Sequence, residues 1–259
     1  MAKRKLSKIS IMHFSRLFLR SALLIAALIL YVINRVQGTG KPFGTIGENH
    51  FVIGAVWLLF AVEMVFRFFP AKFESMGCQK QFKGNYKPKA QEGGKIRPQK
   101  MAWWRTFLSA AVWFALNGVF GVLYYAGIFD EGILVLISLA YAVCDMICVL
   151  FFCPFQTWIM RNKCCTACRI YNWDYAMMFT PLVFFKSFWG WSILGLSLLL
   201  LLEWELLYRF YPERFAENTN CSLSCANCKE KLCHHKKQLR GFLKDRKNRE
   251  RNAKNSVRE

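Results

Sequence analysis

Acidic residues are scarce in this chain of 259 residues, which has 16 Asp and Glu against 36 Lys and Arg and a formal net charge of +20. Several common functional motifs are absent as well. There is no phosphate-binding Walker loop, no Gly-x-Gly-x-x-Gly turn and no recognisable Ser, His and Asp arrangement. The chain has 4 His, none of them deep inside an apolar run, which argues against a membrane haem held by two His.

The apolar residues, in contrast, are abundant and grouped. Hydrophobic residues make up 54% of the chain and form long blocks instead of amphipathic stripes. These blocks run to roughly 17–24 residues, enough for a helix to cross a hydrocarbon core of about 30 Å. This composition excludes an ordinary soluble enzyme, a disordered chain and a small disulfide scaffold. It predicts an all-α polytopic membrane protein.

The blocks predict a six-helix transmembrane bundle over residues 21–208. The expected spans are about 21–36, 51–69, 106–128, 133–155, 175–189 and 191–208. The last apolar stretch, Tyr175 to Tyr208, is too long for one helix to fit the bilayer. We therefore expect two short spans there, with the fold near Lys186 to Trp191.

The basic residues favour six spans over five. With six spans, segments 1–20, 67–105, 156–174 and 209–259 share one side and hold 33 of the 36 Lys and Arg. The positive-inside rule then places both termini in the cytoplasm of a multi-pass protein of the cell inner (plasma) membrane. A cleaved signal peptide fits less well, because no small-x-small site follows the first apolar block.

The segments outside the spans differ in composition. We expect a basic cytoplasmic N-terminus (1–20), a basic loop (70–105), a Cys-rich loop (156–174), a Cys-rich metal-binding tail (209–235) and a basic, disordered or helical end (236–259). The last of these contains one aromatic residue, Phe242, so contact with anionic lipid is a better interpretation than nucleic-acid binding. The lipid bilayer is thus the first expected partner, and the oligomeric state stays open.

Eleven Cys are many for a chain of this size, and the predicted topology puts most of them in the cytoplasm. A disulfide framework is not expected in that reducing compartment, which leaves metal ligation or redox chemistry. The sharpest pattern lies in the tail, where four thiols fall within 13 residues. These are Cys221, Cys225, Cys228 and Cys233. Such soft donors suit zinc or an iron–sulfur cluster, and the alternative is a set of free, exposed thiols.

A second group lies in and before the Cys-rich loop. Cys164, Cys165 and Cys168 fall within five residues, beside Lys163 and Arg169. Cys153, at the end of the fourth expected span, is one candidate for a fourth ligand. Metal or cluster binding, a reactive dithiol and inert thiols all remain open for this group.

One stretch carries a resemblance to a known family. The sequence Cys148-x4-Cys153-Pro154-Phe155-Gln156, followed by a Cys-rich tail, resembles membrane-bound polyferredoxins over about residues 148–168 and 221–233. This chain has four residues between the first two cysteines where that family has three, and its tail lacks the family's proline. The resemblance implies 4Fe–4S clusters in cytoplasmic loops and a soluble or membrane redox partner.

Ionisable groups within the expected spans form a further set of candidates. Glu63 lies one turn before Arg67, so we expect these two side chains to pair. Asp145 has no cation on its own helix and needs a partner from another one, such as Asn117 or Lys186, unless it is protonated. Cys144 and Cys148 flank Asp145 on the fourth span. A proton-, ion- or quinone-handling role for Asp145 and a structural interhelical hydrogen bond are both compatible with this placement.

These observations give three hypotheses for function. The first is electron transfer, or anchoring of a redox partner, through Cys-ligated iron–sulfur or zinc sites. The second is transport of a soft metal ion along Cys144, Asp145, Cys148 and Cys153 of the fourth span. The third is a non-enzymatic membrane scaffold with a zinc-stabilised tail.

Overall fold

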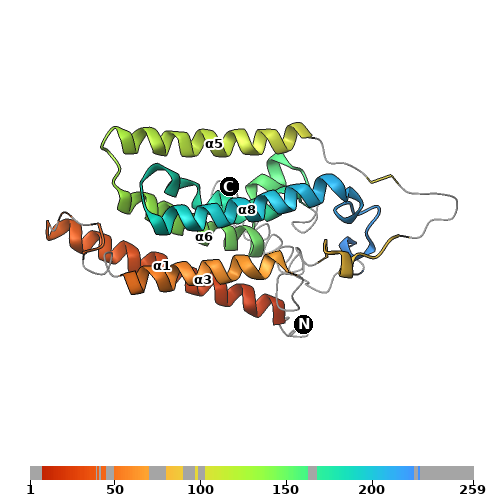
Figure 1. Ribbon diagram of the computed structural model, residues 1–259, viewed down its shortest axis with the longest axis horizontal. Helices are drawn as coiled ribbons and strands as arrows, with labels where there is room; N and C mark the ends of the chain where they lie inside the picture. Colours follow the sequence, from red (N-terminus) through yellow and green to blue (C-terminus); the bar gives the residue numbers. More distant parts are fainter. Residues whose placement is uncertain are drawn as a thin grey trace, which may run out of the picture.

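A computed structural model describes residues 8–38, 40, 42–44, 50–69, 80–89, 97–98, 103–162, 168–224 and 227. This part of the chain is helical and contains no strand beyond one isolated bridge. Five of its helices are long and apolar enough to cross a membrane: α1 (Lys8–Val36), α3 (His50–Phe68), α5 (Trp103–Tyr125), α6 (Glu131–Leu150) and α8 (Phe188–Phe210). They run side by side along the long axis of the molecule (Figure 1). The all-helical class is confirmed, and the described helices are compatible with a multi-pass membrane protein.

The bundle has two distinct ends. Tyr31 of α1 donates its hydroxyl to Asp130, just before α6, over 2.9 Å. At the other end of the same two helices, Phe14 packs against Phe151. α1 and α6 are therefore antiparallel. We call the end beside Asp130 the turn end and the end beside Phe151 the cap end. The start of α1 and the finish of α8 both lie at the cap end, on the right of Figure 1.

The apolar stretch before α8 is not one long helix. It forms α7 (Asp174–Phe179), then the 3-10 turn η5 (Thr180–Phe184), and α8 follows after a break. Pro181 at the start of η5 has no N–H to donate, which favours the change from α-helix to a tighter turn. The Ser187 side chain then accepts from Gly190 N and caps α8. The predicted break near Lys186 is thus confirmed.

The α7–η5 segment runs along α3 from the cap end toward the turn end. Asp174 at its start pairs with Arg67 near the end of α3, whereas Trp189, just after it, packs on Gly54 near the start of α3. Its side chains form the centre of the core, with Tyr175, Met178, Phe179 and Leu182 all buried. The segment is shorter than the span we expect over 175–189, so a count of six membrane spans is not established by helix length.

The outer surface of the bundle is apolar. Large hydrophobic side chains exposed on α5 alone include Phe107, Val112, Phe114, Leu116, Val119 and Val122. In water such a surface would be unfavourable, whereas lipid solvates it, so the exposed pattern agrees with the composition of the helices.

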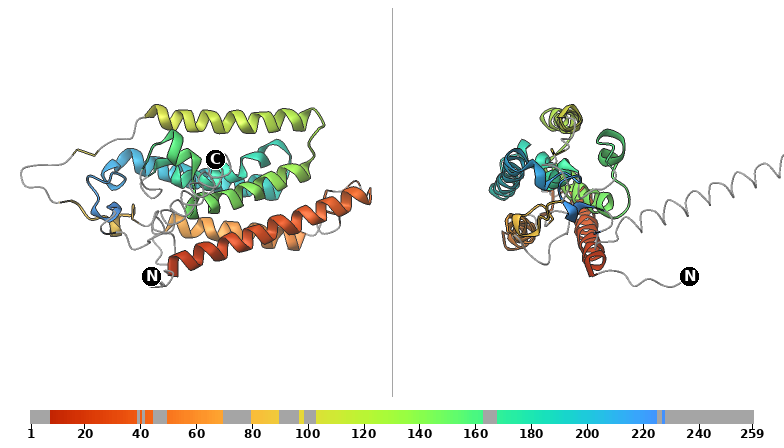
Figure 2. Two further views of the ribbon diagram at one scale, coloured as in Figure 1. Left: turned by 180° about the vertical axis from the view of Figure 1, so that it is seen from behind. Right: turned by 90° about the vertical axis from the view of Figure 1, so that its right-hand side faces the viewer.

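Short segments cover the cap end (Figure 2). They are η1 (Lys83–Asn85), the turn Phe155–Ile159, η4 (Arg169–Trp173), η6 (Pro212–Arg214) and η7 (Cys221–Leu223). Asn172 donates to Gln81, and Asn220 donates to Lys80 O, so the Cys-rich loop and the tail both dock on the 80–89 loop. Phe82 packs against Trp204 of α8 and fixes this cap on the bundle.

Helix bounds differ from those expected at two informative places. α1 begins at Lys8, inside the segment expected to be a separate basic N-terminus (1–20). α6 ends at Leu150, earlier than the expected residue 155, and the chain then turns back through Cys153 and Pro154. Both shifts change which side chains reach the interior, as described next.

Candidate functional site

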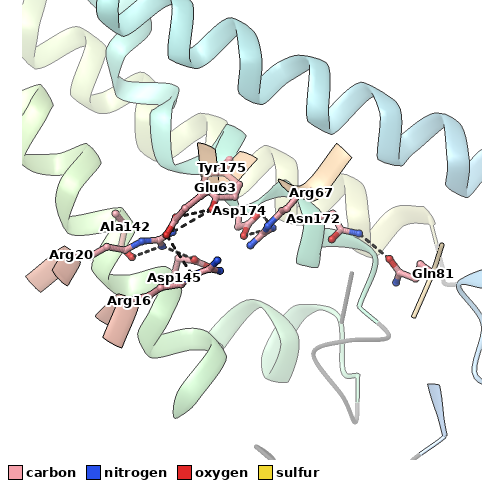
Figure 3. Close-up of polar contacts among 10 residues, drawn as sticks. All are labelled: Arg16, Arg20, Glu63, Arg67, Gln81, Ala142, Asp145, Asn172, Asp174 and Tyr175. Atoms are coloured by element: carbon pink, nitrogen blue, oxygen red, sulfur yellow. Dashed lines mark hydrogen bonds and ion pairs between the residues drawn. The ribbon is translucent and has the colours of Figure 1, made fainter. Parts of the chain in front are cut away.

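A buried arginine joins three helices near the cap end. The Arg20 side chain of α1 is 2% exposed. Its Nη2 lies 2.7 Å from Glu63 Oε2 of α3, and its Nη1 lies 3.0 Å from Asp145 Oδ2 of α6 (Figure 3). The same Nη1 also donates to the carbonyl oxygen of Ala142. Such extensive hydrogen bonding is what makes a buried guanidinium tolerable in an apolar interior.

Arg20 is the residue that sequence reasoning missed. Asp145 does take its partner from another helix, as expected, but that partner is Arg20 and not Asn117 or Lys186. The reason is the early start of α1, which carries a nominally cytoplasmic arginine into the bundle. No sequence signal fixed this position, because basic residues before an apolar block fit a cytoplasmic segment as well as a continuing helix.

The expected pairing of Glu63 with Arg67 is wrong. Glu63 contacts Arg20 and Arg16 of α1 and accepts a 2.9 Å hydrogen bond from the Tyr175 hydroxyl. Arg67 instead pairs with Asp174 over 2.7 Å, and its guanidinium lies 4.6 Å from the centre of the Tyr175 ring. The long arginine side chains reach neighbouring helices, where their partners are buried and electrostatic interactions are stronger.

The charges in this network balance. Three arginines (Arg16, Arg20 and Arg67) meet three carboxylates (Glu63, Asp145 and Asp174). A net charge close to zero lowers the cost of placing ions in an apolar interior. The network ties α1, α3, α6 and α7 into one unit.

A cavity of about 140 Å³ lies next to this network, at the cap end of α6. Four thiol residues and two carboxylates line it. These are Cys144, Cys148, Cys153, Cys168, Asp145 and Asp174. The remaining wall is mostly apolar and includes Trp113, Tyr141 and Met178. Asp145 therefore belongs to both features, because it pairs with Arg20 and also faces the cavity.

Two of these thiols meet directly. The side chains of Cys148 and Cys153 lie close enough to interact, and both line the cavity. They meet because α6 ends at Leu150 and the chain reverses before the turn Phe155–Ile159. The backbone N–H of Gln156 also donates to Cys153 Sγ over 3.4 Å, which holds this sulfur in place. The Cys148-x4-Cys153 spacing thus places both sulfurs at one site.

The other predicted ligands have different outcomes. Cys168 is buried and lines the same cavity as Cys153. Cys221 lies against Pro88 O, with its backbone N–H bonded to Lys87 O on the 80–89 loop. Five predicted ligands fall outside the described residues: Cys164, Cys165, Cys225, Cys228 and Cys233. Among the residues that are described, no group of three or more His, Cys, Asp or Glu could hold a metal ion.

Comparison with known proteins identifies no relative of this chain. No family model, no curated protein and no solved structure matches the chain. The site must therefore be interpreted from its own geometry: a helical chain compatible with several membrane crossings, a buried ion network, and a thiol-lined cavity beside it.

Proposed function

We propose that this protein binds a soft metal ion of the copper(I) type in the cavity at the cap end and carries it across the membrane. The observation that carries this proposal is the contact between the Cys148 and Cys153 thiols in a cavity that Cys144 and Cys168 also line. Thiolates are soft ligands and select soft ions. This is the second hypothesis from the sequence, now supported by the proximity of its residues.

The number of thiols in direct contact favours copper(I) over zinc or a 4Fe–4S cluster. Structural zinc and cubane clusters use four ligands, whereas copper(I) accepts two thiolates. The described residues bring two thiols into contact and form no larger ligand group. Copper(I) here is the cargo.

We further propose six membrane crossings with the cap end in the cytoplasm of the inner (plasma) membrane. The α7–η5 segment, with its six α-helical and five 3-10 residues, measures about 19 Å at ordinary helical rises. The extended residues before Phe188 add about 10 Å, enough to approach the thickness of the hydrocarbon core. This arrangement places the segments that hold 33 of the 36 Lys and Arg at the cytoplasmic end, with Arg16, Arg20 and Arg67 of these reaching into the bundle, and it opens the cavity near that side.

In this account the ion network has a defined role. Arg20 fixes Asp145 in the cavity wall, beside the thiol pair. Without Asp145, the uncompensated charge of Arg20 would repel a cation in this low-dielectric wall more strongly than in water. Asp145 therefore permits entry of the cation, and the sulfurs bind it.

Copper(I) titration of the full chain in detergent, under anaerobic conditions and against a competing chelator, tests the binding. The double variant Cys148→Ser/Cys153→Ser should lose one equivalent of bound copper(I). The matched control Cys221→Ser, which changes a thiol on the 80–89 loop contact, should lose none from this site. Equal binding by wild type and the double variant would refute the proposal. If the wild-type protein instead has two fewer free thiols than expected before titration, Cys148 and Cys153 form a disulfide.

Uptake of copper(I) into proteoliposomes tests the transport step. Asp145→Asn keeps the shape of the side chain and removes its charge, so uptake should fall while the thiol pair is retained. Unchanged uptake in this variant would contradict the role given to Asp145.

A second candidate function is electron transfer through an iron–sulfur cluster. The observation in its favour is that buried Cys168 shares the cavity with Cys148 and Cys153, and that it follows Cys164 and Cys165 in sequence. Anaerobic purification should then give a coloured protein with bound iron and a soluble or membrane redox partner. A colourless protein without iron would remove this candidate, and zinc alone on the tail would support the scaffold hypothesis.

A further inference from the structure

Polar side chains follow one face of α5 from the cap end to the middle of the bundle. Thr106, Ser109, Trp113 and Asn117 recur at spacings of three and four residues, and all are buried. Such spacing places them on the same side of the helix. A buried polar stripe is unusual for a helix whose opposite face is covered by exposed Phe and Val.

Several atoms on this stripe lack a partner. Among the described residues, Thr106 Oγ1 and Asn117 Oδ1 have no hydrogen-bond partner. Asn117 is 1% exposed and uses only its Nδ2, which donates to Trp113 O on its own helix. Because an unpaired amide oxygen is costly in an apolar interior, a mobile partner such as water is expected beside it.

The facing helix repeats the pattern. Ser138 and Tyr141 of α6 also carry buried oxygens with no hydrogen-bond partner in the described part of the chain. The Tyr141 ring lies 4.5 Å from that of Trp113, and its hydroxyl lies near the Asn117 side chain. Trp113 Nε1 donates to Thr180 of η5 over 3.3 Å.

This polar interface is continuous with the thiol-lined cavity. Trp113 and Tyr141 belong to the cavity wall, and they also contact the deeper polar residues Asn117 and Thr180. Trp113 and Tyr141 thus connect the cavity at Cys148 to the polar side chains that lie deeper between α5, α6 and η5.

The polar stripe is followed by an aromatic contact on the turn-end side. Phe184 of η5 packs so closely over Gly121 of α5 that a Cβ there would lie 2.5 Å from Phe184 Cε1. Tyr125 packs edge-on against the same ring, and Phe120 packs near Phe129. The polar stripe therefore ends at apolar side chains on this side. We call the contact of Phe184 with Gly121 the seal.

We propose that the interface of α5, α6 and η5 holds a water-filled pathway from the cavity to Asn117 and Ser138, closed toward the turn end by Phe184 over Gly121. The pathway admits water and small cations. Its use by copper(I) rests on the function proposed above, whereas the presence of water does not.

X-ray hydroxyl-radical footprinting of the full chain, read by mass spectrometry, tests the pathway because radicals form from water beside the labelled side chain. Tyr141 and Trp113 should be labelled several-fold faster than Phe179, which is buried against Phe60 in the apolar core. Asn117→Leu should slow labelling of Tyr141, and Ser138→Ala should slow it to a smaller extent. Equal labelling of Tyr141 and Phe179 in wild type would overturn the pathway without any variant.

The same measurement tests the seal and separates the two proposals. Phe184→Ala should extend labelling to Phe120, and no gain there would overturn the closure. Copper(I) binding at Cys148 and Cys153 should survive in Asn117→Leu. If Tyr141 is labelled but copper(I) does not bind, the pathway stands and the soft-metal function is refuted. If copper(I) binds but Tyr141 is not labelled, only the pathway is refuted.

Discussion

Arg20 on α1 and Asp145 on α6 form a 3.0 Å ion pair across 125 residues of sequence. Arg20 also pairs with Glu63, so one guanidinium contacts two partly buried carboxylates. Together with the Tyr31–Asp130 hydrogen bond at the turn end, this pair fixes α1 beside α6. The stability of the bundle should depend on this cation more than on any exposed charge.

Arg20→Met should lower the free energy of unfolding by about 3–5 kcal/mol, because Asp145 would lose its cation and Glu63 would keep only Arg16, with both carboxylates largely shielded from water. Unfolding of the purified protein in detergent measures this change. Arg35→Met is the matched control, since Arg35 is 75% exposed and lies 3.8 Å from Asp130. That control should change stability by less than about 1 kcal/mol.

Adding Glu63→Gln and Asp145→Asn to Arg20→Met should recover much of the lost stability, because the variant then has no unpaired carboxylate at this point. A triple variant no more stable than Arg20→Met would contradict the assignment of the loss to buried charge.

Gly121→Ala should destabilise the fold by about 1–3 kcal/mol, since the new Cβ would overlap the Phe184 ring. Gly118, one turn earlier on α5, has nothing within 4 Å of the position that a Cβ would occupy. Gly118→Ala should therefore be neutral or stabilising by up to about 1 kcal/mol, as expected for alanine in a helix. Similar thermal shifts for the two variants would argue against the close packing of α5 on η5.

Much of the architecture follows from the pattern of apolar residues. The long helices and the break near Lys186 could be predicted because helices need long apolar runs to cross a bilayer and begin where N-capping residues such as Ser187 occur. The beginning of α1 could not be placed, because basic residues before an apolar block are equally compatible with a cytoplasmic segment and with a continuing helix.

Asn220→Ala should release the tail from the 80–89 loop. The buried Asn220 side chain donates to Lys80 O and Arg214 O and accepts from Ser222 N, so its loss should cost about 1–3 kcal/mol locally. Modification of Cys221 by a maleimide, resolved by mass spectrometry, should become faster. Asn218→Ala, which removes one exposed hydrogen bond to Arg97 O, should leave the rate unchanged. Equal rates in both variants would show that Asn220 does not hold the tail.

Two glutamates on α8 should respond differently to loss of charge. Glu205 accepts hydrogen bonds from Arg169 and, over 2.7 Å, from Trp173 Nε1, so Glu205→Gln should destabilise the cap by about 1–2 kcal/mol. Glu203 has one buried oxygen without a hydrogen-bond partner in the described part of the chain, and Glu203→Gln should be neutral or stabilising. Thermal unfolding compares the two, and a greater loss from Glu203→Gln would reverse their assigned roles.

The site was less predictable than the fold. The grouping of Asp145, Cys144, Cys148 and Cys153 around one cavity could be inferred from one helix and its end, because their spacing is local. The pairing of Glu63 with Arg20 and of Arg67 with Asp174 could not, since it depends on how distant helices pack. The predicted tail and loop ligands outside the described residues remain predictions.

The proposed function depends most on joint binding of one soft ion by Cys148 and Cys153. X-ray absorption spectroscopy of the full chain loaded with one equivalent of copper(I) measures the ligands directly. We expect a copper(I) site with two sulfur ligands in wild type and in Cys221→Ser, and its loss in Cys148→Ser/Cys153→Ser. An unchanged sulfur shell in the double variant, or a wild-type site made of nitrogen and oxygen ligands, would contradict the account.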